Sequence, residues 1–138
     1  MGDDVHITKK ENWSDEHGPA ISLQEWIELV ESDPEMGLDG FAEAATNDGR
    51  ILRIKMAGLS VWTAYSKNGQ EGNQAWFGLW GGNVVVKNPD SEIRRKMYAL
   101  ARILSAKVQG DEGEIYGPDG NPSSHSARRF VPFARFRR

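Results

Sequence analysis

Three acidic residues near the end of the chain, Asp111, Glu112 and Glu114, have the types and close spacing of oxygen ligands for a cation. A calcium loop of the EF-hand kind needs ligands at alternating positions and a closing bidentate glutamate at the twelfth. Glycines and Tyr116 interrupt that register here. We therefore predict no metal or other cofactor, and we interpret the segment as a solvated acidic turn or as a patch for a cationic partner.

The histidines His6, His17 and His125 lack the spacing of zinc ligands on a helix, because none lies three to five residues from another. The sequence has no G-x-S-x-G nucleophile motif, no phosphate-binding glycine loop, no H-E-x-x-H and no cysteine. We predict no catalytic residues. The alternative is a hydrolase with an unrecognised carboxylate pair, which the sequence cannot select among 20 acidic residues.

Trp76 and Trp80 project from one face of a predicted strand, and the aromatic and aliphatic residues between them project from the other. Two helices on one face cannot cover rings on both, so we expect aromatic surface on the uncovered face. Tryptophan is enriched in binding hot spots, which makes both residues candidate partner-binding residues together with the acidic turn. The structural alternative is that the rings shield the bare backbone of Gly78 or pack beneath the C-terminal segment.

Charge is divided unevenly along the chain. Residues 1–127 hold all 20 acidic residues but only 12 of the 17 lysines and arginines, a formal charge of −8, whereas residues 128–138 carry five arginines and three phenylalanines. An acidic body favours a basic partner, while a basic aromatic tail favours nucleic acid or a membrane. The other interpretations of the tail are a loosely ordered terminus or a segment folded back onto the acidic domain.

Two helices and a series of strands must position these residues. Ser22 and Glu25 predict a capping box for a first helix that ends at Asp33, before a proline. Asn88 is the predicted cap of a second amphipathic helix. Strands are predicted at residues 5–8, 41–45, 51–56, 60–66, 74–80 and 83–87, with short closing strands at 107–109 and 114–116.

This pattern predicts the α+β class, with a mainly antiparallel sheet of about five strands and both helices on one face. The 138 residues suit a single domain. Because residues 117–126 have linker composition, we predict a domain over residues 1–116 and a linker with a basic aromatic tail over 117–138. We expect a cytoplasmic protein, since no signal peptide, membrane-spanning stretch or cysteine is present.

The order of short motifs between Asp4 and Tyr116 resembles that of a set of small, mostly uncharacterised bacterial proteins. These motifs are Asp4–Thr8, Asn12–Ser14, Ile21–Trp26, Asp33–Glu35, Trp62–Thr63, Ala75–Phe77, Gly82–Asp90, Lys96–Met97 and Ala106–Tyr116. Such proteins look like immunity proteins of bacterial polymorphic toxin systems, which are small, acidic, cysteine-poor α+β domains. The resemblance implies a protein without an active site that neutralises a cognate toxin by direct binding.

We therefore expect a non-enzymatic binding protein whose partner is a protein toxin with a basic surface. Two functions of other classes compete with it. One is a nucleic-acid or membrane-associated accessory protein that acts through the C-terminal tail, and the other is the hydrolase with unrecognised carboxylates.

Overall fold

The computed structural model describes residues 4–39, 41–45, 47–55, 57–70 and 74–123. These residues form two helices, α1 (Leu23–Ser32) and α2 (Ser91–Leu104), and nine strands, six of which follow one another between the helices, which confirms the predicted α+β class. The strands are β1 (Asp4–Thr8), β2 (Met36–Leu38), β3 (Phe41–Ala45), β4 (Ile51–Lys55), β5 (Ser60–Trp62), β6 (Ala75–Trp80), β7 (Asn83–Lys87), β8 (Lys107–Gly110) and β9 (Ile115–Tyr116).

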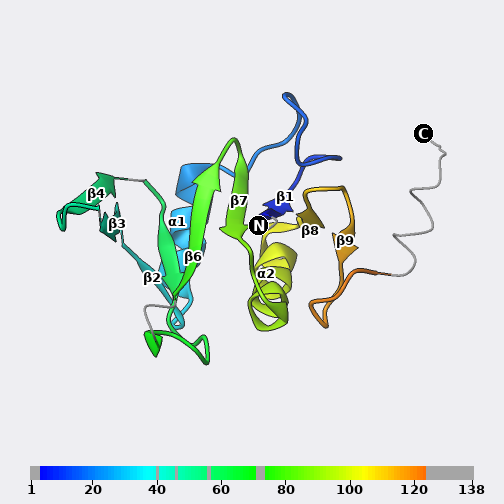
Figure 1. The fold of residues 1–138 in the computed structure, drawn as a ribbon. Coiled ribbons are helices and arrows are strands. Elements are labelled where there is room, and N and C mark those ends of the chain that lie inside the picture. Colours follow the sequence, from blue (N-terminus) through cyan, green and yellow to red (C-terminus); the bar gives the residue numbers. More distant parts are fainter. Residues whose placement is uncertain (1–3, 40, 46, 56, 71–73, 124–138) are drawn as a thin grey trace.

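Seven strands form one antiparallel sheet in the order β2-β5-β6-β7-β1-β8-β9. The N-terminal β1 lies inside the sheet, where His6 pairs with Val85 of β7 on one side and with Gln109 of β8 on the other. β3 and β4 form a separate hairpin, which lies beyond β2 at one end of the molecule (Figure 1). The described sheet has more strands than the expected five or so and a different membership: β2 was not predicted, and the predicted strands at 41–45 and 51–56 lie outside it in the separate hairpin.

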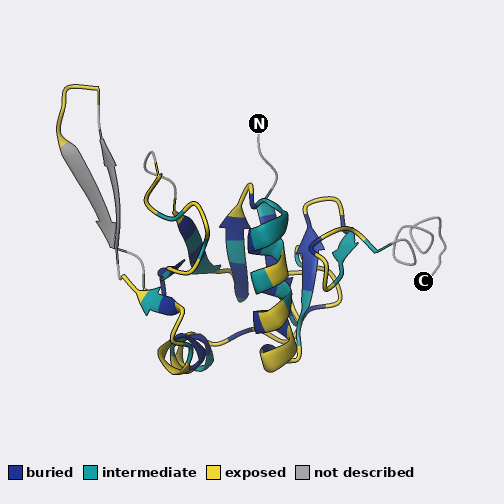
Figure 2. Ribbon diagram, turned by 90° about the horizontal axis from the view of Figure 1, so that it is seen from below, coloured by how far each residue is buried: buried dark blue, intermediate teal, exposed yellow. Residues whose placement is uncertain are grey.

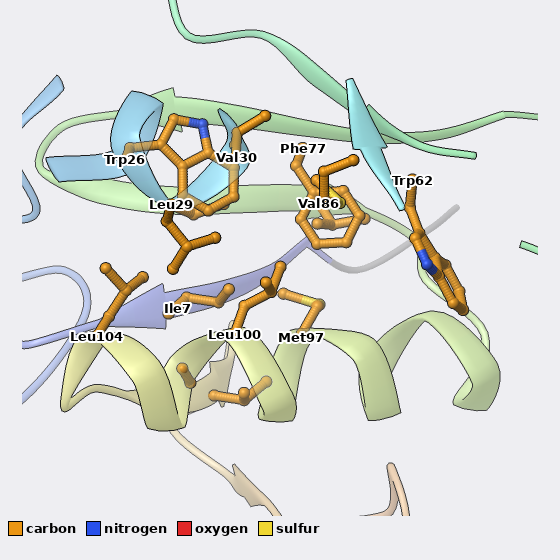
Figure 3. Close-up of a cluster of buried hydrophobic side chains, with 14 of the residues drawn as sticks. Ile7, Trp26, Leu29, Val30, Trp62, Phe77, Val86, Met97, Leu100 and Leu104 are labelled. Carbon is orange, nitrogen blue, oxygen red and sulfur yellow. The ribbon is translucent and has the colours of Figure 1, made fainter. Parts of the chain in front are cut away.

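Both helices cover the same face of this sheet, as predicted. Figure 3 shows side chains of α1 and α2 converging on those of the central strands; they include Trp26, Leu29 and Val30 of α1, Met97, Leu100 and Leu104 of α2, and Ile7, Phe77 and Val86 of the sheet. The exposed residues of each helix lie on its outer side (Figure 2). Neither helix in the described part of the chain has the length and apolar character that crossing a membrane requires.

The opposite face of the sheet is covered by neither of the two described helices and is named the open face. Side chains alternate between the two faces along a strand. Since Ile7, Phe77, Val84, Val86 and Val108 face the helices, their neighbours along the strands face the other way. The open face therefore carries Asp4, His6, Trp76, Trp80, Asn83, Val85 and Gln109.

The start of α1 agrees with half of the predicted capping box. Ser22 Oγ accepts a hydrogen bond from the Glu25 N–H at 3.0 Å, which satisfies one of the free donors of the first turn. The Glu25 carboxylate instead accepts from Lys9 Nζ at 2.7 Å. The reciprocal half of the box is thus replaced by an ion pair to the segment before the helix.

The predicted cap of α2 is wrong. Asp90 is the N-cap, and its Oδ1 accepts from the Ile93 N–H at 2.9 Å. Asn88 has a φ of 53°, in the left-handed region, so the chain uses it to turn out of β7 before the helix begins. Both residues carry a suitable side-chain oxygen, and the turn decides which of them stands at the helix end.

The predicted strand at residues 60–66 is also too long, since β5 ends at Trp62. Beyond it, the Thr63 N–H donates to the Glu35 carbonyl oxygen at 2.8 Å, and Tyr65 Oη donates to Asp90 Oδ2 at 2.6 Å. These bonds turn the chain away from β6 and toward the start of α2.

The tip of the β6–β7 hairpin fits closely against the segment that precedes α1. Gly82 has a φ of +82°, and a Cβ there would lie 2.8 Å from Ala20 Cβ. The Ile21 N–H donates to the Gly82 carbonyl oxygen at 2.9 Å. A larger residue at position 82 would face both backbone strain and a clash, so glycine allows this contact.

The described chain runs to residue 123, inside the segment predicted as a linker, and residues 116–123 contact the rest of the fold. The Ser123 N–H donates to the Ile115 carbonyl oxygen at 2.7 Å, and the Arg94 guanidinium of α2 lies 5.0 Å from the centre of the Tyr116 ring. Arg94 Nε also donates to the Gly120 carbonyl oxygen. The predicted basic aromatic tail, with all its arginines and phenylalanines, lies outside the described residues.

Candidate functional site

An open pocket of about 560 Å³ lies on the open face, beside the β6–β7 hairpin, β1 and the segment of residues 9–22 that joins β1 to α1. In Figure 1 this blue segment passes the tip of the hairpin before α1 begins. Four carboxylates line the pocket, those of Asp4, Asp15, Glu16 and Asp111, together with the indole of Trp80. It is named the acidic pocket.

Hydrogen bonds from side chains hold the connecting segment in place. Lys10 is buried, and its ammonium donates to the backbone carbonyl oxygens of Gly81 at 2.8 Å and Asp15 at 2.9 Å. The Trp13 N–H donates to Gln109 Oε1 at 2.7 Å. Because these bonds join the segment to the hairpin tip and to β8, the wall of the pocket is fixed by strands on both sides.

Asn83 forms a further link between the hairpin and this segment. Its Nδ2 donates to the Trp13 carbonyl oxygen at 3.0 Å, and that bond sets the orientation of the amide, since a flipped amide would place two acceptors together. Asn83 lines the pocket, and its buried Oδ1 has no hydrogen-bond partner among the described residues. Buried polar atoms without a hydrogen-bond partner are uncommon in native structures.

His6 lies at the floor of the pocket in a well-defined orientation. Its ring stacks on the Trp13 indole, with centroids 4.0 Å apart and planes 7° from parallel. His6 Nδ1 lies 3.3 Å from the Gln109 carbonyl oxygen, and because a carbonyl only accepts, Nδ1 carries the proton and donates. Burial lowers the pKa of His6 by more than this bond and the charges of Asp111 and Asp4 raise it. The imidazole is therefore neutral near neutral pH, and its Nε2 is an acceptor.

Asp111 lies beside this ring. Its Oδ1 is 3.8 Å from His6 Nε2, too far for a hydrogen bond, and its Oδ2 accepts from the Asp4 N–H at 3.1 Å. The Asp111 side chain is 38% exposed, whereas that of His6 is 5% exposed. One acceptor at the mouth of the pocket thus faces another acceptor at its floor.

The two predicted tryptophans occupy different environments. Trp80 is 72% exposed and lines the acidic pocket. Trp76 lies on the same face of β6, opposite Val61 of β5, where it is half-buried and does not line the pocket.

The three predicted acidic residues are also separated. Asp111 lines the pocket, whereas Glu112 is exposed and lies outside the lining. Glu114 accepts from Tyr116 Oη at 3.1 Å and from the Glu112 N–H at 3.2 Å, so its carboxylate shapes the turn. The structure therefore brings Asp111 and Trp80 together and leaves the other predicted residues apart from them.

Asp33, Glu35 and Asp90, whose pKa values are lowered, lie elsewhere, and two of them, Asp33 and Asp90, hold the helices in place. The pKa of Asp33 is lowered overall. Burial raises it, but the hydrogen bonds from Lys96 Nζ, at 2.7 Å, and from the Glu35 N–H lower it by more. Burial likewise raises the pKa of Asp90, but the hydrogen bonds from the Tyr65 hydroxyl and from the Ile93 N–H at the start of α2 lower it by more. Neither residue lines the acidic pocket.

The chemistry that the pocket offers is the binding of hydrogen-bond donors and positive charge. It combines four carboxylates, a neutral imidazole and an exposed indole. Within the described ranges, no group of three His, Cys, Asp or Glu residues is arranged to hold a metal ion.

Sequence reasoning assigned no role to His6 and did not identify Trp13 or Asn83 as site residues. The alternation of β1 places His6 on the open face, so that signal was present. The fold of the segment that carries Trp13 has no comparable signal.

Comparison with known proteins finds no matching family model, no matching curated protein and no matching solved structure. The likeness to immunity proteins accordingly stays a prediction from the sequence, and the function is argued from the pocket.

Proposed function

We propose that this protein binds a partner protein with a basic surface at the acidic pocket and performs no chemistry of its own. The observation that carries the proposal is one pocket that joins Trp80, 72% exposed, to the carboxylates of Asp4, Asp15, Glu16 and Asp111. In the cell, we propose an immunity protein that neutralises a cognate toxin by covering its basic surface, as the sequence resemblance implies.

The charges of the pocket favour a basic partner. The ammonium of Lys10 is the positive group in the lining, and it is already bonded to two carbonyl oxygens. Asp15, Glu16 and Asp111 are exposed, so the lining keeps an excess of negative charge at the surface. A negative surface of this kind accelerates encounter with a positive one, and salt weakens the effect.

Trp80 adds an apolar contact to the electrostatic attraction. A large ring that is mostly exposed gains much apolar burial when a partner covers it. Such residues commonly act as binding hot spots, and their removal mainly accelerates dissociation. The pocket thus combines attraction over distance with a contact that holds the complex together.

The first experiment is to capture the partner from the native host with the wild-type protein, with Trp80→Ala and with Ile103→Ala as parallel baits. Ile103 is 70% exposed on α2, so it is a matched control for an exposed apolar side chain away from the pocket. A specific partner should be retained by the wild type and by Ile103→Ala and be lost from Trp80→Ala.

Rates with the identified partner then test the mechanism. Asp111→Lys should slow association and flatten its salt dependence, and Trp80→Ala should accelerate dissociation. Glu112→Lys carries the same charge change just outside the pocket, so it should slow association but leave dissociation unchanged. Unchanged rates for both pocket variants would exclude the acidic pocket as the binding surface.

Neutralisation is tested in cells that express the captured partner. Growth arrest by the partner should be relieved by the wild-type protein and by Ile103→Ala, and much less by the double variant of Trp80→Ala and Asp111→Lys. A partner that is harmless to the cell would exclude the immunity role. Turnover of a substrate by the purified protein would exclude the non-enzymatic function altogether.

A further inference from the structure

Two hydrogen-bond acceptors face each other in the acidic pocket. His6 Nδ1 donates to the Gln109 carbonyl oxygen, which leaves the neutral ring with a lone pair on Nε2. Asp111 Oδ1 lies 3.8 Å from that nitrogen. Of the two carboxylate oxygens, Oδ2 already accepts from the Asp4 N–H, so Oδ1 is the one turned to the ring.

A hydrogen-bond donor placed between these two atoms would satisfy both. A proton on His6 Nε2 would create an ion pair with Asp111, but burial of the ring opposes that charge. The titratable groups that face the ring are Asp111 and Asp4, and the Trp13 stack and the Gln109 carbonyl complete its surroundings. With the ring neutral, a group bearing several N–H donors and a positive charge satisfies both acceptors together.

We propose that the acidic pocket receives an arginine side chain of the partner protein, with its guanidinium donating to His6 Nε2 and Asp111 Oδ1. This inference rests on the proposed function, because it specifies which group of a basic partner enters the pocket. Asp4, Asp15 and Glu16 surround the same space and balance the guanidinium charge.

Arginine suits this lining better than lysine for three reasons. Its planar fork presents several donors at once, so it can contact an imidazole nitrogen and a carboxylate oxygen together. Its guanidinium is more weakly hydrated than an ammonium and therefore enters a partly buried site more readily. A guanidinium also stacks favourably on an exposed indole, and Trp80 lines the pocket.

The test uses the full chain and a small probe, N-acetyl-arginine methylamide, followed by nuclear magnetic resonance of the His6 ring and the Trp80 indole. The citrulline analogue is the matched control, since it keeps the shape and loses the charge and one donor pair. We expect saturable shifts of both resonances with the arginine probe in the millimolar range and none with the citrulline probe. Asp111→Asn should lower the affinity for the arginine probe by about tenfold or more, whereas Glu112→Gln should leave that affinity unchanged.

A second readout is the pH dependence of probe binding. A cation beside His6 and a proton on His6 exclude each other, so the affinity should fall as the pH is lowered through the titration of His6. The titration of His6 itself should move to lower pH when the probe is bound. A purely structural His6 would show neither effect.

The outcomes also separate this inference from the proposed function. Equal shifts with citrulline, equal affinity for the lysine analogue, or no effect of Asp111→Asn would overturn the arginine site, even if a captured partner still depends on Trp80. Saturable, Asp111-dependent arginine binding supports the site, even if no toxin is found and the immunity role fails.

Discussion

Replacing Trp26 by alanine tests the packing that holds α1 against the sheet and, through it, the segment that forms the pocket wall. Trp26 is 0% exposed, its ring lies 6.4 Å from that of Phe77, and its indole N–H donates to the Gly58 carbonyl oxygen at 2.8 Å. Removing a buried ring of this size costs about 3–5 kcal/mol. Since domains of this size are stable by about 5–15 kcal/mol, the variant should lose a large part of its free energy of unfolding.

Trp26→Phe separates the hydrogen bond from the ring. The Gly58 carbonyl oxygen also accepts from Ser60 Oγ at 3.0 Å, so it keeps one partner, and we expect a loss of only about 1–2 kcal/mol. Ile103→Ala, on the exposed side of α2, should change stability by less than about 0.5 kcal/mol. Urea denaturation followed by far-ultraviolet circular dichroism measures all three variants without relying on tryptophan fluorescence. A wild-type midpoint for Trp26→Ala would refute the assignment of this side chain to the core.

Three further predictions concern ionisable groups. Because burial lowers the pKa of His6, the unfolded chain takes up a proton first as the pH falls below ~6.5; denaturation at several pH values should show stability falling there, and His6→Gln should flatten that dependence. Lys96→Met removes the partner of the Asp33 carboxylate, whose side chain is 16% exposed, and should cost about 1–3 kcal/mol. Because the pKa of Asp33 is lowered in the folded protein, the stability that its carboxylate contributes is lost in the wild type as the pH falls below ~4. Lys96→Met should therefore lose less stability than the wild type over this acid range. An equal loss in both proteins would contradict the prediction. The hydrogen bond to Asp90, with burial, raises the pKa of Tyr65 to about 12, so an alkaline absorbance titration should show this tyrosine ionising late, and Asp90→Asn should shift its ionisation toward ~10.

Local patterns predicted the parts of the fold that depend on local contacts. The helix after Ser22 needs only a cap and an apolar stripe, and both are short-range features of the sequence. The turn of β6 into β7 needs two residues with positive φ, which Gly81 and Gly82 provide.

Long-range pairing was not predictable in the same way. Nothing in the composition of β1 indicates that it lies between β7 and β8, because the partners are far away in sequence. The end of β5 depends on Tyr65 reaching Asp90, a contact made possible by the position of α2.

In the candidate site, too, local features were predictable and long-range contacts were not. Alternation along β6 placed Trp76 and Trp80 on one face and predicted aromatic surface on the uncovered face of the sheet, and the acidic turn marked Asp111. Their meeting in one pocket follows from the sheet order. The stacking of Trp13 on His6 depends on a segment of irregular structure, whose path is set by Lys10 and Asn83 through backbone carbonyls that no side-chain pattern reveals.

The geometry of His6 also bears on the hydrolase alternative. A histidine that acts as a general base has one ring nitrogen held by an acceptor and the other directed to the substrate, with a pKa near the working pH. His6 has the first feature, but its Nε2 faces a carboxylate oxygen at 3.8 Å, and burial lowers its pKa. A proton taken from a substrate would be stabilised by Asp111 yet opposed by desolvation, whereas a cationic donor placed between the two acceptors leaves the ring neutral. Proton capture and cation binding therefore compete for the same nitrogen, and the preference of the buried ring for its neutral form favours cation binding. Arginine binding that weakens as His6 gains its proton is the behaviour that distinguishes a recognition pocket from an acid–base site.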